Sequence, residues 1–215
     1  MDSSSSPRPS FSLLGWGVIF LIATLLIGAA ALTFRRVEKN HHHPREHPFL
    51  AEIPPFSFTT QEGRMLRKED LLGKIWIADF IFTRCAGPCP LLTSRMLELS
   101  SRLTNNPQVK LVSITVDPLY DTPEVLHRYA STIHADPSRW FFLTGPLPAM
   151  STFIQEGMKQ PLAIDPEGTP NHSTRLMLVD RQGMIRGYEE GSDPEVVQKL
   201  LTKIGDLLRE SPHSF

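Results

Sequence analysis

The two cysteines of this chain are its most chemically informative residues, because they stand close together where the local structure is expected to change. Cys85 and Cys89 are the only cysteines among 215 residues and lie in the segment TRCAGPCP, residues 83–90. The apolar run before them, residues 75–82, predicts a strand, and residues 91–103 predict a helix. The thiols are therefore expected at a helix N-terminus, where the helix dipole favours the thiolates that attack disulfides or bind metal.

A structural disulfide or simple burial is the alternative explanation of this pair. A bridge that closes so short a loop would restrict the unfolded chain only modestly. The intervening Gly87 and Pro88 favour a rigid, exposed turn over a packed core. We therefore interpret the pair as a reactive site. The pair alone leaves redox chemistry and metal binding both open.

Length and composition narrow the possible classes of protein. A chain of 215 residues with 40% hydrophobic residues suits one folded domain plus an extension. The formal net charge of -1, without a basic patch interleaved with aromatic residues, argues against nucleic-acid binding. A single cysteine pair also excludes a scaffold built on several disulfides.

The N-terminal part predicts a membrane anchor that follows a short tail, residues 1–10. Residues 11–34 carry no charged side chain. As a helix they would extend about 36 Å, which exceeds a hydrocarbon core of about 30 Å. The alternative is a cleaved signal peptide, with the alanine run at residues 29–31 as its cleavage site.

The charges that flank the predicted anchor conflict with the expected chemistry of the cysteines. Arg8 and the α-amino group supply the positive charge before the anchor, whereas Arg35, Arg36, Lys39 and Arg45 follow it. The positive-inside rule alone would place the large domain in the cytoplasm. A pair able to form a disulfide persists better in an oxidising compartment.

Beyond the anchor, residues 35–55 predict a polar tether, residues 56–210 a folded domain, and residues 211–215 a short tail. The tether contains four histidines, at positions 41, 42, 43 and 47, which either bind metal or form a solvated stalk. In the domain, predicted strands alternate with predicted helices before a final hairpin and helix. Further strands are expected at residues 109–116, 140–143, 175–180 and 184–189, and further helices at residues 123–133, 148–156 and 193–209. This order predicts a mixed α/β sheet with helices on both faces, of the thioredoxin-like fold.

Three segments in order resemble the Sco/SenC family, which are membrane-anchored, thioredoxin-like copper-binding proteins that assist assembly of the CuA centre of cytochrome c oxidase. Residues 82–90, FTRCAGPCP, are similar to the family's C-x-x-x-C-P motif, although the family often has proline directly after the first cysteine and an acidic residue in the loop. Residues 113–126, SITVDPLYDTPEVL, resemble its second signature. His172 precedes a predicted strand, in the place of the family's copper-ligand histidine.

The resemblance implies that Cys85, Cys89 and His172 bind one copper ion per chain. Soft thiolates select Cu(I) and imidazole suits either oxidation state, although two cysteines and one histidine could also bind zinc. Asp117, at the end of a predicted strand on the same edge, is expected to tune thiol protonation or orient a ligand from outside the ligand set. Asp121 is expected to belong to the start of the next helix.

The resemblance further implies a copper chaperone, rather than an enzyme, that delivers copper to the CuA site of a cytochrome c oxidase subunit or a similar copper protein, or prepares the thiols of that site. Its expected place is the cell inner membrane, single-pass, with the domain on the periplasmic side. The alternative is a thiol–disulfide oxidoreductase that uses Cys85 and Cys89. Thr174 stands where redox relatives of this fold usually have a cis-proline, which favours metal binding. A peroxidase-like enzyme lacks a second cysteine pattern, and an interaction module is a more distant alternative.

Overall fold

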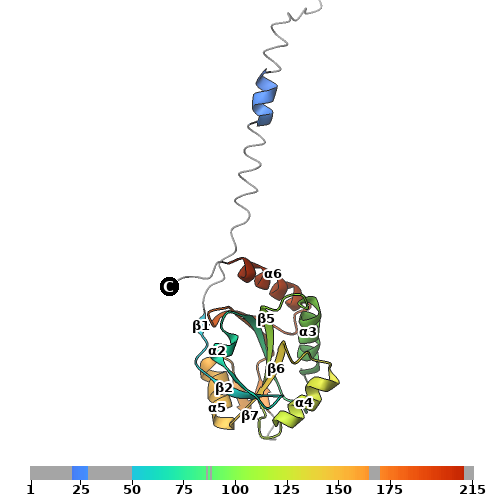
Figure 1. Ribbon diagram of the computed structural model, residues 1–215, viewed down its shortest axis with the longest axis vertical. Coiled ribbons are helices and arrows are strands. Elements are labelled where there is room, and N and C mark those ends of the chain that lie inside the picture. Colours follow the sequence, from blue (N-terminus) through green and yellow to red (C-terminus); the bar gives the residue numbers. More distant parts are fainter. Residues whose placement is uncertain (1–20, 29–49, 86, 88, 165–169, 211–215) are drawn as a thin grey trace, which may run out of the picture. The chain divides into compact units, whose positions relative to one another are not determined.

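The computed structural model describes residues 21–28, 50–85, 87, 89–164 and 170–210 (Figure 1). The chain divides into two units, residues 1–44 and 45–215, and the second unit contains the sheet. In the first unit, residues 21–28 are helical. Within the described ranges, no helix has the length and apolar character that crossing a membrane requires. Most of the predicted anchor, residues 11–34, lies outside those ranges, as do both tails and the tether histidines.

An eight-stranded mixed sheet forms the centre of the second unit. Its order is β1 (Ala51–Glu52), β10 (Met184–Glu190), β9 (Arg175–Val179), β4 (Ile75–Ile81), β5 (Val109–Thr115), β6 (Trp140–Thr144), β2 (Ser57–Thr60) and β3 (Met65–Arg67). The neighbours β4, β5 and β6 are parallel, and the other pairs are antiparallel. A separate hairpin consists of β7 (Leu162–Ile164) and β8 (Pro170–His172).

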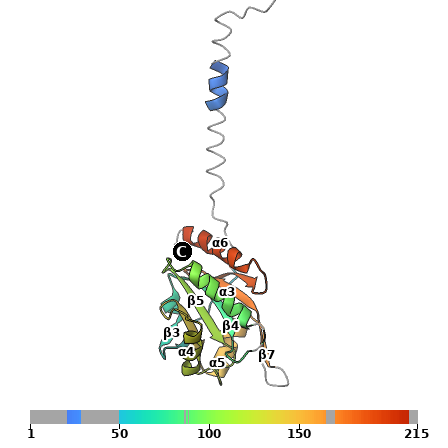
Figure 2. The same cartoon turned by 90° about the vertical axis from the view of Figure 1, so that its right-hand side faces the viewer.

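Helices cover both faces of the sheet, so the central strand β4 is buried at every position. Strands covered on both sides are apolar throughout rather than alternating, which explains the run at residues 75–82. One face packs against α3 (Cys89–Arg102), α4 (Pro123–Thr132) and α6 (Val196–Arg209). Figure 2 shows α3 and α6 side by side over the sheet. The other face packs against α2 (Lys68–Leu71), α5 (Leu147–Thr152) and the π-helical turn η1 (Phe153–Gly157).

The predicted mixed α/β arrangement is confirmed, and the structure adds elements that the sequence did not indicate. Thr122 caps α4 by accepting a hydrogen bond from the Val125 N–H. The elements not predicted are β1, β2, β3, α2 and the β7–β8 hairpin, which are short. β1 lies within the range assigned to the tether and pairs with β10.

The topology places three separated segments at one edge of the sheet. β4 and β5 are parallel and in register from Ile75↔Val109 to Ile81↔Thr115, so both strands end at the same edge. β9 runs antiparallel to β4 and therefore begins near that edge. The cysteine segment, residues 117–121 and the segment with His172 consequently meet there, although they are far apart in the sequence.

Candidate metal centre

Asp121 anchors the cysteine loop to β5. The backbone N–H of Thr83 donates to both carboxylate oxygens of Asp121, at 3.2 and 3.3 Å, and the hydroxyls of Thr83 and Thr115 donate to the same group. Burial raises the pKa of Asp121 despite these hydrogen bonds. We expected Asp121 to belong to the start of α4, but Thr122 is the cap and Asp121 instead positions the loop that carries Cys85.

Cys89 is the first residue of α3 and is only 3% exposed. Burial, followed by a hydrogen bond with the Cys85 thiol, raises the pKa of Cys89 to about 12. The expectation of an exposed turn with a stabilised thiolate is therefore wrong for Cys89. The helix dipole favours the anion by a modest amount, and the loss of hydration on burial outweighs it. Cys89 is therefore a protonated thiol in the unloaded protein.

His172 ends β8 and points its ring at Cys89. Its Nε2 lies 3.7 Å from the Cys89 Sγ, and its Nδ1 lies 2.8 Å from the carbonyl oxygen of Ser173. A carbonyl oxygen only accepts hydrogen bonds, so Nδ1 carries the proton and the Nε2 lone pair faces the sulfur. Burial lowers the pKa of His172, which favours the neutral ring. The edge-to-face packing of Phe82, with ring centroids 5.7 Å apart, further fixes the ring.

The separation between Cys89 and His172 fits two ligands of one metal ion. Typical metal–sulfur and metal–nitrogen bonds of about 2.3 and 2.0 Å, taken from zinc sites, span 3.7 Å when the angle between them is about 120°. In the unloaded protein the Cys89 thiol lies within hydrogen-bond distance of Nε2. A metal ion would therefore bind between the same two atoms.

Cys85 is half-buried, and its Sγ accepts a hydrogen bond from the Gly87 N–H at 3.3 Å. Both cysteines are free thiols. Across the described ranges, no three His, Cys, Asp or Glu side chains form a preassembled metal cluster. Two of the three predicted ligands, Cys89 and His172, already face each other.

Asp117 contacts the residue before Cys85 rather than a sulfur atom. Its carboxylate accepts hydrogen bonds from the Arg84 guanidinium at 2.8 and 2.7 Å, and this guanidinium lies 4.8 Å from the Tyr120 ring centroid. The ion pair links the loop after β5 to the cysteine loop. Any influence of Asp117 on the thiols therefore acts through Arg84 and the loop backbone.

Two features of the centre escaped the sequence analysis. The hairpin that carries His172 consists of two strands of three residues, which are too short to show an alternation of apolar and polar side chains. Asp79 is fully buried in the middle of β4. The sequence marks this position only by a single acidic residue within the otherwise apolar run 75–82.

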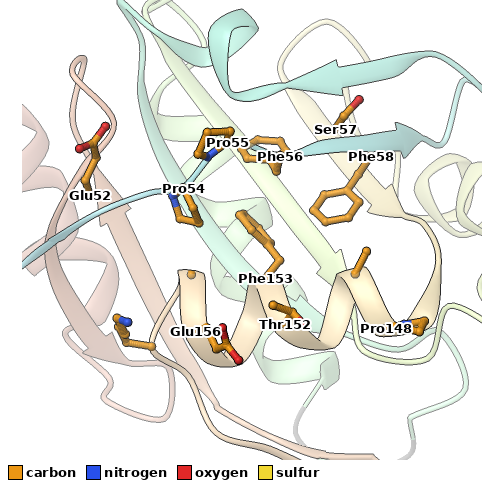
Figure 3. A pocket seen from close by; sticks show the side chains of 13 residues that line it. Glu52, Pro54, Pro55, Phe56, Ser57, Phe58, Pro148, Thr152, Phe153 and Glu156 are labelled. Atoms are coloured by element: carbon orange, nitrogen blue, oxygen red, sulfur yellow. The ribbon is translucent and has the colours of Figure 1, made fainter.

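A cleft lies apart from the residues of the candidate metal centre. It has a volume of about 850 Å³ and lies between the segment 52–58 and the α5–η1 region. Figure 3 shows Phe153 pointing toward Phe56 and Phe58, and the three rings pack together with centroids 4.9 to 5.7 Å apart. The residues that line this cleft include no cysteine or histidine, so it is not part of the metal centre.

A thioredoxin-like fold that holds two thiols and an imidazole at one sheet edge defines a narrow class of proteins. The family model described as SCO1/SenC matches residues 45–207. The chain therefore belongs to the SCO1/SenC family. The SCO1 protein homolog of Bacillus subtilis (strain 168) is 35% identical over 143 residues, which cover 64% of this chain and 73% of that protein.

Solved structures agree with this assignment. A SCO1/SenC family lipoprotein from Bacillus anthracis str. Ames is 29% identical, with a TM-score of 0.70 over 74% of this chain and 95% of that one. BsSco is a member of the Sco family of cytochrome c oxidase assembly proteins in which a disulfide switch was identified. It is 28% identical, with a TM-score of 0.69 over 77% of this chain and 98% of that one. Arabidopsis thaliana ScoI with copper bound shares the fold, at 22% identity and a TM-score of 0.61 over 74% of this chain and 97% of that one.

Proposed function

We propose that this protein is a membrane-anchored copper carrier that binds one copper ion per chain through Cys85, Cys89 and His172. It would deliver this ion to the CuA site of a cytochrome c oxidase subunit or to a similar copper protein, or prepare the thiols of that site. The observation that carries the proposal is the pairing of Cys89 with the unprotonated Nε2 of His172 at 3.7 Å. Copper-bound structures within the family support the choice of metal.

The ligand set suits a carrier better than a permanent metal site. Two soft thiolates select Cu(I), and a single imidazole completes three-fold coordination. Three ligands leave room for an incoming ligand from the acceptor. His172 also lines an open cleft of about 640 Å³, together with Gln155, Gln160 and Asn171, which gives a partner access from the hairpin side.

Replacing either cysteine tests the copper site directly. In Cys85→Ser and Cys89→Ser, we expect the loss of tight Cu(I) binding, because each change removes one of only two thiolates. The measurement is metal analysis and competition with a Cu(I) chelator, on protein kept reduced and anaerobic. One copper per chain, retained at wild-type affinity by either variant, would refute the site.

A thiol–disulfide oxidoreductase is the second candidate, because both cysteines are free thiols and Cys85 influences the pKa of Cys89. The relative with a disulfide switch supports the same possibility. His172→Ala separates the two functions. We expect this variant to bind Cu(I) at least about tenfold more weakly while its thiols still form a disulfide at close to the wild-type rate. Wild-type copper affinity combined with a loss of disulfide exchange would favour the oxidoreductase.

We place the domain on the periplasmic side of the cell inner membrane, held by residues 11–34 as a single span. Copper delivery to a CuA-type site, as proposed above, takes place on that side. The lipoprotein among the structural relatives is consistent with attachment to a membrane. The flanking basic residues oppose this orientation, but large domains can translocate despite such charges.

A further inference from the structure

The loop between β5 and α4 places its charged and apolar side chains in the opposite way from an ordinary surface loop. Asp117 and Asp121 are buried, whereas Leu119 is 78% exposed and Tyr120 is 48% exposed. The two carboxylates face inward, where they bind Arg84 and Thr83 of the cysteine loop. Buried charges and exposed large apolar side chains are both unusual at a protein surface. Leu119 and Tyr120 together form an apolar surface that no other part of the described chain covers.

The backbone of this loop is fixed by hydrogen bonds, so the two apolar side chains are held in place. The Tyr120 N–H donates to the Asp117 carbonyl oxygen at 3.1 Å, which closes a turn with Pro118 at its second position. The Asp121 N–H donates to the same oxygen at 2.9 Å. The Asp117 N–H in turn donates to the Thr115 hydroxyl at 3.0 Å. A surface that is ordered before a partner arrives loses little conformational entropy on binding.

Arg84 joins the Leu119–Tyr120 surface to the metal centre. Arg84 directly precedes Cys85, and its guanidinium lies 4.8 Å from the Tyr120 ring centroid. The same guanidinium forms an ion pair with Asp117 at 2.7 Å. Cys85 itself is half-buried, so the centre opens to solvent on the segment that this ion pair holds. The exposed apolar surface therefore lies beside the accessible cysteine.

Copper transfer determines what must cover this surface. An acceptor takes the ion only if its own ligands approach to about 2.0–2.3 Å of the metal, the usual length of a metal–ligand bond. At that distance the acceptor must contact the exposed side chains around Cys85. Protein interfaces place apolar and aromatic residues at their centre, and such residues account for most of the binding energy. A second copy of this chain would cover the centre without taking the ion, so the acceptor is the occupant that transfer requires.

We infer that Leu119 and Tyr120 form the docking surface for the protein that accepts copper from this chain. This inference rests on the proposed function. The matching surface of the acceptor is apolar and lies next to vacant copper ligands. Neither Leu119 nor Tyr120 is a copper ligand. Docking on this surface therefore sets how strongly the acceptor binds, and leaves the affinity of this chain for copper unchanged.

Copper transfer by Leu119→Ser tests the docking surface. The full-length chain, reduced, loaded with Cu(I) and in detergent, is mixed with increasing amounts of the soluble CuA-bearing domain of the same organism's cytochrome c oxidase. The acceptor concentration that gives half of the limiting transfer rate should rise about tenfold, as expected for truncation of a central interface residue. The limiting rate, the Cu(I) affinity and the transfer rate to a small chelator should equal those of the wild type.

Leu72→Ser is the matched control, because it makes the same change at another exposed leucine. Leu72 follows α2, which packs on the other face of the sheet from α3, and it is 44% exposed. This variant should transfer copper to the acceptor domain like the wild type. The comparison separates the place of the lost side chain from a general loss of surface hydrophobicity.

The remaining outcomes distinguish failure of this inference from failure of the proposed function. A half-saturating acceptor concentration that is equal in Leu119→Ser and wild type would overturn the docking surface and leave the copper carrier intact. Slower transfer of copper to the chelator would also overturn it, because Leu119 would then act on the copper site. A dimer in sedimentation that Leu119→Ser abolishes would assign the surface to a second copy. Wild-type protein that binds no copper, or transfers none to the domain, would refute the proposed function and this inference with it.

Discussion

At the scale of single residues, the chemistry of this centre depends on where protons are held before metal arrives. The Cys89 thiol, the His172 ring and the Asp79 carboxyl each have a pKa moved toward the neutral form by burial. The neutral ring presents Nε2 to the Cys89 sulfur at 3.7 Å. The unloaded site is therefore close to a metal-binding geometry without containing an uncompensated thiolate.

The raised pKa of Asp79 predicts how stability depends on pH. Burial raises the pKa of this carboxyl to about 7 in the folded protein, against about 3.8 in the unfolded chain, so raising the pH through this window favours unfolding. Asp79→Asn removes this penalty. The variant should become progressively more stable than wild type from about pH 4 to pH 7, by up to about 4 kcal/mol, and the difference should be constant above that window.

Denaturant unfolding of the reduced protein across this pH range provides the measurement. Asp136→Asn serves as the control, because the pKa of that exposed carboxyl is lowered and it stays ionised throughout most of the window. A stability difference between Asp79→Asn and wild type that does not change with pH would contradict the assigned titration.

At the scale of elements, the centre depends on how closely the His172 segment packs against α3. Gly191 follows β10, and its N–H donates to the Thr174 carbonyl oxygen at 3.0 Å. A Cβ at this position would lie 2.1 Å from Leu92 Cδ2 and 2.6 Å from that carbonyl oxygen. Glycine is therefore required for steric reasons, because only its small size lets the segment after His172 reach the helix that begins at Cys89.

Gly191→Ala should consequently separate the histidine from the cysteine. We expect a loss of about 1–3 kcal/mol in the free energy of unfolding, typical of overpacking, together with weaker Cu(I) binding. Gly205→Ala in α6 is the matched control, since its nearest neighbour is a flexible Arg209 side chain at 3.5 Å. Unfolding and copper titrations of the two variants provide the comparison. Equal copper affinity in both would show that Gly191 does not position His172.

At the scale of the whole molecule, a buried cluster of ion pairs joins the last helix to the sheet. The Arg186 guanidinium contacts Asp180 at 2.9 Å and Glu210 at 2.9 and 3.0 Å, and only 2% of the Arg186 side chain is exposed. This cluster ties the end of α6 to β10. The C-terminal helix is thereby fixed over the face of the sheet that also carries α3.

The orientation of the domain in the membrane is the prediction at this scale. A periplasm-dependent alkaline phosphatase fused after Phe215 should be active, and a reporter that functions only in the cytoplasm should be inactive at the same position. Fusions to a chain that lacks residues 11–34 serve as the control and should reverse this pattern. Activity of the cytoplasmic reporter alone would place the thiols in a reducing compartment, away from the CuA-type site that is proposed to receive the copper.

Features that depend on neighbouring residues could be predicted from the amino-acid sequence. The apolar run of β4, the helix after Cys89 and the Thr122 cap follow from side-chain period and local hydrogen bonding, so each could be recognised within one segment. The order of these segments indicated a mixed α/β sheet. Cys85, Cys89 and His172 were likewise selected from their types and their places in three motifs.

The protonation and contacts of these residues depend on long-range packing and could not be predicted from the sequence. Asp121 holds a loop 38 residues away, and His172 meets Cys89 across 83 residues. The helix position of Cys89 suggested a thiolate, but packing against the core kept the thiol protonated. In the sequence Asp79 is a single acidic residue within an apolar run. In the structure the fold buries it completely. Burial and long-range contacts set the pKa and ring orientation, and neither quantity is encoded by any local pattern.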